Sequence, residues 1–593
     1  MIIFSTVYRL HHGIPLLGCV SLQLVCGVAL AQSSLPVSVA QEGLRREEER
    51  SRVQQSRLAP TTDVLQPSRA VSFDTVLPSE TPCFLIRDIV LSGESHRQFR
   101  WLLDSAQGYL NRCVGTVGLS KIASVLDAKL TEFGYATTTV TLPAQNLAEG
   151  TLQVRLHAGR VGVIRMVSAK DADKASAAAE PTESATDTAW GTWRNAFATS
   201  TGDVLNMRDL EQGVEQMQRL ASQHVITELH PGQQPDTSTL LIRRQDATLR
   251  ERLHGGANVD NADSTVLGKP HISGNLGLDN PLGLNDLLSL SVSSNIDGLS
   301  ARHRSQNVAR AYSIPWGYNT FSLTNSSSEF AQVVQGTTAQ FLSSGSSRTL
   351  EAKWHRTLLR TSSSKTGAYA SLQLRRATSY LDEVELVAQR QRTTNVETGV
   401  TFRRLLDNAS VDLQAGYRHS MPRQFAPDDL NGATQGGPTL RPALWIASGR
   451  YRQSFQLGQQ PVQFSAELRA QQTADATLAT DQIAIGNRAT VRGFDGDSVL
   501  LAESGYVTRN ELARPVQWLA GVESQVYAGI DAGRVWGTSA ASLIGDRLAG
   551  AVLGIRGKWQ AAQSELSYGT PLYKPAGFRS ANHNLTLSLT VAF

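Results

Sequence analysis

The sequence predicts a mainly β fold in which a C-terminal antiparallel β-barrel crosses a membrane and two small α/β modules precede it. Three observations support this. The final ten residues, NLTLSLTVAF, alternate between apolar side chains and polar or small ones, as in a strand with one apolar face. Similar runs recur between residues 253 and 593, separated by Gly, Asn, Asp and Ser clusters. An apolar stretch at residues 14–31 indicates export.

We expect residues 1–31 to be a cleaved export signal. Arg9, His11 and His12 precede the apolar run, which ends in the A-x-A pattern of residues 29–31. A membrane anchor helix is the alternative, but the run is short and ends in small residues. No other apolar run of about eighteen residues occurs, so we expect no transmembrane helix. A closed barrel can still cross a membrane, because it satisfies its backbone hydrogen bonds internally.

The composition argues against several kinds of site. A net charge of +4 on 593 residues is too small to indicate a nucleic-acid partner. Cys19 and Cys26 lie in the signal, which leaves Cys83 and Cys113 as an expected disulfide in an exported chain. Zinc would need further ligands nearby, and the twelve histidines show no metal spacing. No nucleophile, base and acid set is apparent, so we predict no catalytic residues, no metal, no cofactor and no enzyme.

The segment after the signal, residues 32–57, contains a charged stretch at 41–57 that favours helix but offers few apolar side chains. It could be a solvated tail or a helix that sits in a water-filled cavity. Residues 58–82 carry four prolines and no periodicity, which is typical of a linker.

Two α/β modules follow, at residues 83–160 and 161–246. An apolar stripe predicts the clearest helix, 119–133, and Gly134 follows it as a cap. Both modules are expected to have the order β-α-α-β-β, and the second carries a polar insertion at 168–188. The expected elements are strand 84–91, helices 98–110 and 119–133, and strands 135–142 and 151–157, then strand 161–167, helix 206–220, and strands 225–229 and 239–243.

The remaining residues, 250–593, are long enough for about 16 strands with their connections. A soluble protein would need another layer to cover so many apolar strand faces, whereas lipid covers them in an outer-membrane barrel. The final strand alone could also be the edge of a soluble sandwich. A barrel of this size leaves an aqueous channel unless a segment plugs it.

Two motifs in the barrel half form the candidate site. One is a tetrapeptide in a stretch too polar for a lipid-facing strand: Val491, Arg492, Gly493 and Phe494. The other lies in the alternating run 526–535, whose lumen-facing positions include Gly529, Asp531 and Gly533. The two glycines leave the inner wall without side chains beside Asp531, so the loop could approach closely. Arg492 could then form a bidentate pair with the carboxylate of Asp531. Alone, each motif is also compatible with an ordinary surface loop or a wet wall residue.

The chain resembles the two-partner secretion transporters of the Omp85 superfamily, of the haemolysin and filamentous-haemagglutinin secretion type. The resemblance covers nearly the whole mature chain. Its residues are 83–84, 113, 134–137, 142–145, 150, 159–160, 205–213, 231–232, 279–286, 312–317, 491–494, 509–511, 529–533 and 593. The chain departs from the family pattern in the 168–188 insertion, at Ala221, where proline is common, and at Gly529, where an aromatic is common.

The resemblance implies a role for each part. The modules would be periplasmic POTRA domains that receive an unfolded exported protein, and residues 32–57 would contain the helix that plugs the barrel at rest. The loop with Arg492 would fold into the pore and pair with Asp531. Phe593 would complete the signal recognised by the barrel-assembly machinery.

The implied function is an outer-membrane translocator that secretes its partner protein through the barrel. The partner could be an adhesin, a haemolysin or a contact-dependent toxin, and the other expected partners are outer-membrane lipid and the assembly machinery. An Omp85-type assembly factor for outer-membrane proteins is the first alternative. A passive porin, or an adhesin carried on a barrel, is the second.

Overall fold

A computed structural model gives the fold of the chain. It describes residues 43, 45–46, 49, 63–66, 76–168, 190–245, 247–261, 264–265, 268–296, 302–335, 339–421, 429–430, 433–518 and 521–593. The predicted export signal, most of 32–57 and nearly all of the predicted insertion lie outside these residues. Within them, no helix is both long enough and apolar enough to cross a membrane.

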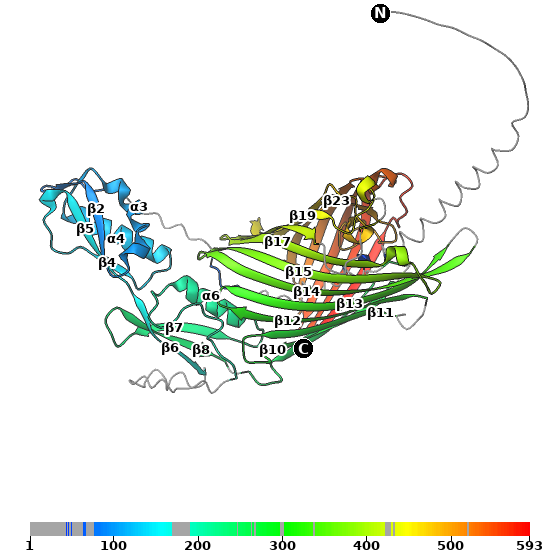
Figure 1. The fold of residues 1–593 in the computed structure, drawn as a ribbon, viewed down its shortest axis with the longest axis horizontal. Coiled ribbons are helices and arrows are strands. Elements are labelled where there is room, and N and C mark those ends of the chain that lie inside the picture. Colours follow the sequence, from blue (N-terminus) through cyan, green and yellow to red (C-terminus); the bar gives the residue numbers. More distant parts are fainter. Residues whose placement is uncertain are drawn as a thin grey trace, which may run out of the picture.

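The C-terminal half is a closed antiparallel barrel of 16 long strands, as predicted (Figure 1). Consecutive strands pair around the wall, and β27 closes the ring by pairing with β9. The strands are β9 (Leu253–Asp260), β10 (His271–Asp279), β11 (Leu287–Asn295), β12 (Arg304–Trp316), β13 (Asn319–Gln335), β14 (Gln340–Arg360), β15 (Ser364–Leu381), β17 (Gln391–Leu405), β18 (Ala409–Ser420), β19 (Ala443–Leu457), β20 (Gln460–Gln472), β23 (Ser504–Val516), β24 (Glu523–Trp536), β25 (Arg547–Trp559), β26 (Ala562–Tyr573) and β27 (Asn584–Ala592).

The connections at one end of the barrel contain short elements. These are β16 (Val384–Glu385), η4 (Val387–Gln389), η5 (Ala433–Gln435), η6 (Ala479–Asp481), the paired strands β21 (Ile483–Ile485) and β22 (Leu500–Ala502), and η7 (Ser539–Ser542). The connections at the other end face the two modules, so that end is periplasmic and the end with the short elements is extracellular (Figure 1).

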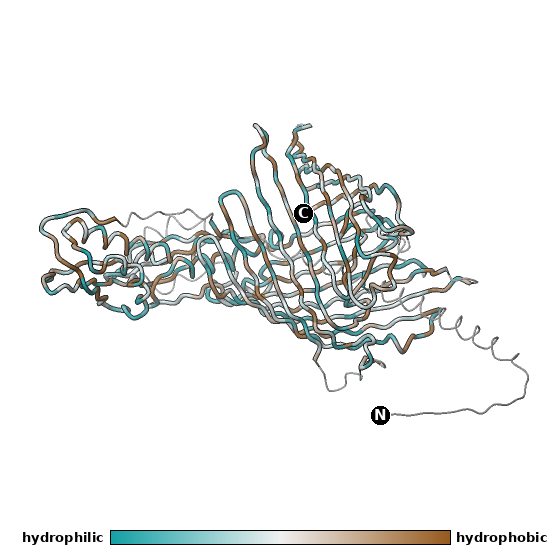
Figure 2. Tube along the Cα trace, turned by 90° about the horizontal axis from the view of Figure 1, so that it is seen from above, coloured by the Kyte–Doolittle hydropathy of each residue, from teal (hydrophilic) through white to brown (hydrophobic). Residues whose placement is uncertain are grey.

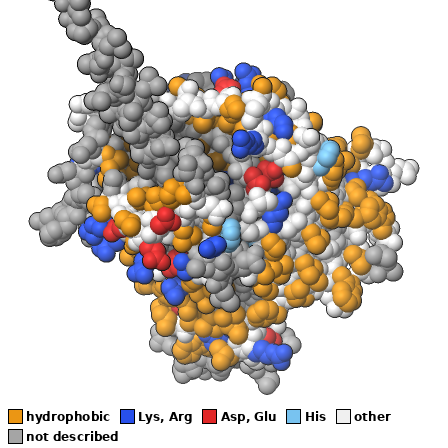
Figure 3. All heavy atoms as spheres, turned by 90° about the vertical axis from the view of Figure 1, so that its right-hand side faces the viewer, with side chains coloured by type: hydrophobic (Ala, Val, Ile, Leu, Met, Phe, Trp, Pro, Cys, Tyr) orange, Lys and Arg blue, Asp and Glu red, His pale blue; other side chains and the backbone are white. Residues whose placement is uncertain are grey.

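The period-two pattern of the strands separates two environments. Ile530 points outward and is 61% exposed, whereas its neighbour Asp531 points into the lumen and is 0% exposed. In the last strand, Leu585, Leu587 and Leu589 are all exposed on the outer wall, as predicted. Hydrophobic and hydrophilic positions alternate along the strands (Figure 2), and hydrophobic side chains gather on the flank of the barrel (Figure 3). The apolar outer wall is the surface that lipid covers.

The first module contains β1 (Phe84–Ile86), β2 (Asp88–Gly93), η1 (His96–Phe99), α3 (Leu102–Ala106), η2 (Gln107–Tyr109), β3 (Arg112–Val114), α4 (Thr116–Glu132), β4 (Thr139–Thr141), η3 (Leu147–Glu149) and β5 (Thr151–His157). Its main sheet has the order β2-β5-β4, and β1 pairs separately with β3. The predicted stripe of α4 packs into the module core through Ile122, Leu126 and Leu130.

Three predictions of local structure in this module were wrong in detail. The expected strand 84–91 is two strands, because Arg87 and Asp88 both donate their N–H groups to the carbonyl of Gly150. The expected helix 98–110 is three short helical pieces, η1, α3 and η2. The expected strand 135–142 begins only at Thr139, because Tyr135 donates its N–H back to Leu130 and continues the end of α4.

The second module contains β6 (Arg160–Ser168), α6 (Met207–Gln218), β7 (Val225–Pro231) and β8 (Thr237–Arg244), with sheet order β6-β8-β7. Its described residues contain one α-helix, where the predicted order has two. Residues 169–189, which precede α6, lie outside the described residues, and residues 190–206 form turns and extended chain. Here Trp193 and Phe197 pack into the module core.

Candidate functional site

The long connection between β20 and β23 folds back into the barrel. Its turn-rich part, residues 486–499, carries the predicted tetrapeptide and is flanked by β21 and β22. Val491 and Phe494 are fully buried in an apolar cluster with Val507 and Val535 of the wall. Phe494 also meets Phe578 edge to face, with ring centroids 5.8 Å apart. These apolar contacts hold the loop inside the lumen, so Arg492 faces the wall.

Arg492 and Asp531 form the two-pronged pair proposed from the sequence. The guanidinium donates from Nε to Oδ2 at 2.8 Å and from Nη2 to Oδ1 at 2.9 Å. The carboxylate also accepts the backbone N–H of Arg492 at 2.9 Å and that of Asn510 at 3.3 Å. Because Asp531 is inaccessible to water, these four donors replace its hydration shell. The loop is therefore attached to β24 by both its side chain and its backbone.

Glycines on the wall make room for this approach. A Cβ at Gly529 would lie 2.6 Å from Nη2 of Arg492, and one at Gly533 would lie 2.8 Å from Ile485 Cγ2. Gly529, where the resemblance favours an aromatic, therefore has no space for one in this arrangement. The motif glycine, Gly493, has a φ of +109°, a conformation that side chains disfavour. Its Cα packs against Gly569 of β26.

The arginine also belongs to a wider charge network. Its Nη1 donates to Glu511 at 2.6 Å, and Arg556 donates to both oxygens of Glu511 at 2.6 and 3.0 Å. Arg556 stacks 3.9 Å from the ring centre of Tyr527, whose hydroxyl donates to Glu565 at 2.6 Å. Sequence reasoning missed Arg556 and Glu565. Their only signal was a charged residue at a lumen-facing position of a strand, a feature that recurs around the barrel.

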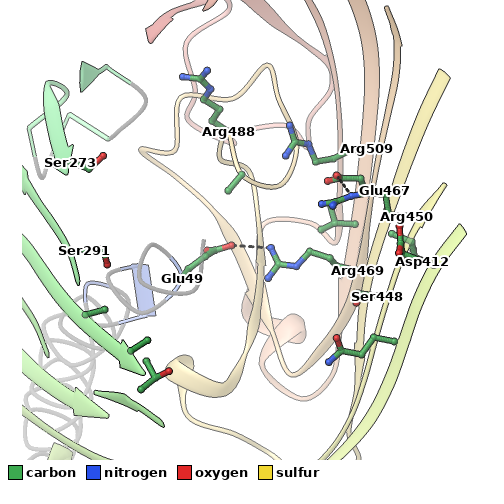
Figure 4. A pocket seen from close by; sticks show the side chains of 18 of the residues that line it. Glu49, Ser273, Ser291, Asp412, Ser448, Arg450, Glu467, Arg469, Arg488 and Arg509 are labelled. Carbon is green, nitrogen blue, oxygen red and sulfur yellow. Dashed lines mark hydrogen bonds and ion pairs between the residues drawn. The ribbon is translucent and has the colours of Figure 1, made fainter. Parts of the chain in front are cut away.

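A cavity of about 1490 Å³ occupies the lumen beside this loop. Its lining runs from α6 of the second module, through Glu215 and Arg219, to Arg488 and Arg492 of the loop. Charges of both signs stand side by side on its wall, as the pair of Arg450 with Glu467 illustrates (Figure 4). A lumen of this kind suits a hydrated polar chain rather than an apolar ligand.

Four described residues of the predicted plug helix lie in this lumen: Gly43, Arg45, Arg46 and Glu49. All four have helical backbone. Glu49 accepts from Arg45, one turn earlier, at 2.8 Å and lies 3.5 Å from Arg469 of the wall (Figure 4). Gly43 packs against the ring of Phe330 on β13. At these positions the chain is a helix inside the barrel, as the plug requires.

The linker returns to the periplasmic rim. Asp63 lies 2.5 Å from Nε of Arg403 and 3.1 Å from Nζ of Lys365. Lys365 also contacts Glu215 of α6 at 2.7 Å. The backbone of Gln66 donates to the carbonyl of Ser362 at 2.8 Å. One lysine therefore connects the linker, the barrel and the second module.

The second module is fixed to the barrel through α6 and through the turns at 280–286 and 317–318. Gln216 donates to the carbonyl of Gly317 at 3.0 Å, and Tyr318 donates to Asp209 at 2.5 Å. Burial raises the pKa of Asp209, and the bond from Tyr318 offsets part of that rise. Arg360, at the end of β14, is 1% exposed and lies 2.9 Å from Glu215.

The segment before α6 also binds these turns. Asn195 donates to the carbonyls of Leu284 and Pro315 at 2.5 and 3.0 Å, and the indole of Trp190 donates to the carbonyl of Asn280 at 2.7 Å. The turns coincide with the sequence motifs at 279–286 and 312–317. Those motifs are therefore the docking points of the second module.

Two further predicted residues have clear positions. Cys83 and Cys113 form a disulfide that joins the start of the chain's first module to β3. Phe593 exchanges backbone hydrogen bonds with Gly255 of β9, at 2.9 and 3.0 Å, and its side chain is exposed on the outer wall. Among the residues that the structure describes, no group of three or more His, Cys, Asp or Glu side chains could hold a metal ion.

Comparison with protein families gives three matches along the chain. Residues 84–159 match the POTRA domain of ShlB type, and residues 171–231 match a POTRA domain. Residues 236–557 match the haemolysin secretion/activation protein family ShlB/FhaC/HecB. The order of the matches is the order of the modules and barrel in the structure.

Individual relatives span the same length. The chain is 32% identical over 588 residues to the outer membrane transporter CdiB-2 of Burkholderia pseudomallei, covering 95% of this chain and 96% of that protein. It is 26% identical to the outer membrane transporter CdiB of Escherichia coli, covering 100% and 95%. It is 22% identical to the hemolysin transporter ShlB of Serratia marcescens, covering 77% of each.

Solved structures share the fold. CdiB from Acinetobacter baumannii superimposes with a TM-score of 0.77 at 23% identity, covering 94% of this chain and 99% of that one. CdiB from Escherichia coli gives 0.75 at 24% identity with the same coverage. Two modules followed by a barrel are thus a known arrangement.

Proposed function

The chain belongs to the haemolysin secretion/activation family, and from this premise we propose how it carries a large exported partner across the outer membrane through its barrel. The barrel lies in the outer membrane, and both modules lie in the periplasm. The observation that carries the mechanism is the polar lumen, which opens toward α6 of the second module and contains the helical residues 43, 45–46 and 49 and the loop of Arg492. In the proposed resting state the helix obstructs this path.

We divide the chain into an export signal at 1–31, a plug region at 32–57, a linker at 58–82, POTRA 1 at 83–160, POTRA 2 at 161–246 with its insertion at 168–188, and the barrel at 250–593. In this scheme the exported partner meets POTRA 1 and POTRA 2 before it reaches the lumen.

The POTRA sheets offer edges for an unfolded chain. Among the strands that the structure describes, β2 and β4 of the first module and β7 of the second each pair with one strand only, whereas the start of β6 is also bonded to residues 202–204. An extended partner segment can add a strand to such an edge through backbone hydrogen bonds, which tolerates variation in the partner sequence. Transport needs no catalytic residue on this route. Folding of the partner outside the cell would bias its movement outward.

The obstruction must then move. Glu49 of the helix lies 3.5 Å from Arg469 of the wall, and contacts of this kind between charged side chains break and re-form readily. The loop of Arg492 is held to the wall by a buried bidentate pair. We therefore infer that the helix leaves the lumen first, and that the loop keeps the wall in shape while the partner passes.

Phe593 is proposed to complete the signal that the barrel-assembly machinery reads during insertion. Its exposed ring stands beside the β27–β9 seam, where the barrel closes last in sequence. Outer-membrane lipid is the other proposed contact of the finished barrel.

We expect the gene of the exported partner to lie beside that of this chain, and the test of the proposed function expresses the two together. With the chain present, the partner is expected in the medium; without it, the partner is expected in the periplasm. A partner that reaches the medium equally well without the chain overturns the proposal. Loss of other outer-membrane proteins on deletion, with unchanged partner secretion, would indicate an assembly factor instead.

A further inference from the structure

Three arginines stand in register on neighbouring strands of the barrel. Arg348 of β14 is the direct partner of Arg376 on β15, and Arg376 is the direct partner of Arg392 on β17. Partners in antiparallel strands are roughly 4.5–5.5 Å apart at Cα, so the three residues form a row about 10 Å long. We call it the arginine row.

The arginine row lies on the outer wall of the barrel. All three side chains are exposed, whereas the residues next to them in sequence, such as Ser347, Arg375 and Gln391, are buried toward the lumen. Two residues nearer the periplasm on the same face, β14 has Leu350 and β15 has Leu374, which face each other. The row therefore begins where the apolar wall ends.

Its height follows from the direction of the strands. The turn before β15, residues 361–363, lies beside the linker at the periplasmic rim, so β15 runs from the periplasm toward the outside. Arg376 stands near its outer end, and the outward positions before it are Ala368, Ala370, Leu372 and Leu374. The row is consequently at the level of the headgroups of the outer leaflet.

Within the part of the chain that the structure describes, the arginine row has no ion pair or hydrogen bond from its side chains to a carboxylate. Two of the acidic groups at this end of the strands already have partners. Glu329 pairs with Arg304 at 3.7 Å, and Glu385 pairs with Arg390 at 2.8 Å. Like charges directly opposite each other on a sheet destabilise it, and the effect grows beside a low-dielectric layer. The arrangement calls for an anion from outside the chain.

We propose that the arginine row binds the phosphate groups of an anionic lipid in the outer leaflet, namely the phosphorylated glycolipid headgroup. Guanidinium groups bind phosphate with paired hydrogen bonds, which a compact ammonium cannot form. Three of them in a line can hold two phosphates on one headgroup. The site anchors a lipid to the strands β14, β15 and β17, whose periplasmic ends bind the linker and α6.

The chain offers a matched control. Arg356 of β14 and Arg404 of β17 also point outward and are exposed, but they stand at the periplasmic ends of the same strands. Arg356 faces Ala368, and Arg404 faces Ser364, so neither has an arginine partner. Each replacement of these residues by glutamine removes one positive charge from the outer wall, as in the row, but leaves the three residues of the arginine row unchanged.

The test uses the full-length protein in detergent with purified diphosphoryl lipid A as the probe, and native mass spectrometry as the readout. The unmodified protein and the Arg356→Gln/Arg404→Gln variant are expected to bind equally. Arg348→Gln/Arg376→Gln/Arg392→Gln is expected to bind at least about tenfold more weakly, because charge-assisted hydrogen bonds to phosphate are lost. Heat-modifiable migration on gels checks that each barrel is folded.

Three results would overturn the proposal. One is equal binding by the triple variant. Another is equal binding of lipid A from which the phosphates have been removed. The last is full suppression of binding by inorganic phosphate at a matched phosphate concentration, which would mean a free-anion site rather than a lipid site. If the triple variant does not fold, Arg376→Gln alone, at the centre of the row, replaces it.

Discussion

Replacing Arg492 by alanine tests the central contact of the barrel. Asp531, which is inaccessible to water in the intact protein, would keep only the two backbone donors from residues 492 and 510. Breaking a buried ion pair by removing one partner costs about 3–5 kcal/mol, because the remaining charge is left uncompensated. The docked state of the loop would therefore become about a hundredfold to a few thousandfold less favoured.

The assay has two readouts, partner protein in the medium and trypsin cleavage of the loop at residues 486–499 in the purified barrel. Arg492→Ala is expected to lose most secretion and to become sensitive to trypsin, while heat-modifiable migration still shows an inserted barrel. The secretion and trypsin sensitivity of Arg492→Lys are expected to lie between those of the unmodified protein and Arg492→Ala, because an ammonium group cannot bond to both oxygens of Asp531 at once.

Arg488→Ala is the matched control in the same loop. Its contact with Glu565 is longer, at 3.7 Å, so its loss is expected to cost less than about 1 kcal/mol and to leave secretion unchanged. Full secretion by Arg492→Ala, with a loop as resistant to trypsin as in the unmodified protein, would refute the reasoning.

Three further predictions concern the periplasmic side. Cys83 and Cys113 should resist thiol labelling unless the protein is reduced, and two reactive thiols without reduction would contradict this. Cys83→Ser should lower the free energy of unfolding of the first module in urea by about 3–4 kcal/mol, because the disulfide closes a loop across a separation of 30 residues. Asp63→Ala removes the contact between the linker and Lys365, so proteolysis of the linker should accelerate; unchanged cleavage would exclude an anchor there. Burial raises the pKa of Asp209 in the folded state, so the protein loses stability as the pH rises from the unfolded-state pKa of about 3.9 through the folded-state pKa. Asp209→Asn should therefore reduce the change in the thermal unfolding midpoint between pH 4 and pH 7. An unchanged pH dependence of the midpoint would count against this.

Much of the barrel was predictable because the two faces of each strand follow from the alternation of side chains within that strand. The alternation around Ile530 and Asp531 needed only the geometry of a strand and the presence of lipid on one side. The same pattern predicted the outward leucines of β27. Local reasoning failed where backbone hydrogen bonds crossed between elements, as at Arg87, whose N–H is taken by Gly150. It also gave no account of residues 190–206, where Trp193 and Phe197 pack into the core of the second module.

The candidate site was predictable in part. Arg492 and Asp531 were proposed as a pair because glycines flank the carboxylate in an otherwise regular strand. Arg556 and Glu565 were not, because a charged lumen residue looks the same in sequence whether or not a partner faces it. The roles of α6 and of the turn at Gly317 as a docking surface also depended on distances between residues about a hundred positions apart.

The sequence by itself determined the order of the modules and the barrel and which face of each strand meets lipid, since these depend on composition and on a period of two. Apart from the pair of Arg492 with Asp531, only the tertiary structure decided which charges lie together. It brings Asp63 to Lys365, and it places Arg348, Arg376 and Arg392 in one row because closure of the barrel sets the register between strands. That register is a property of the whole ring, so no single strand encodes it.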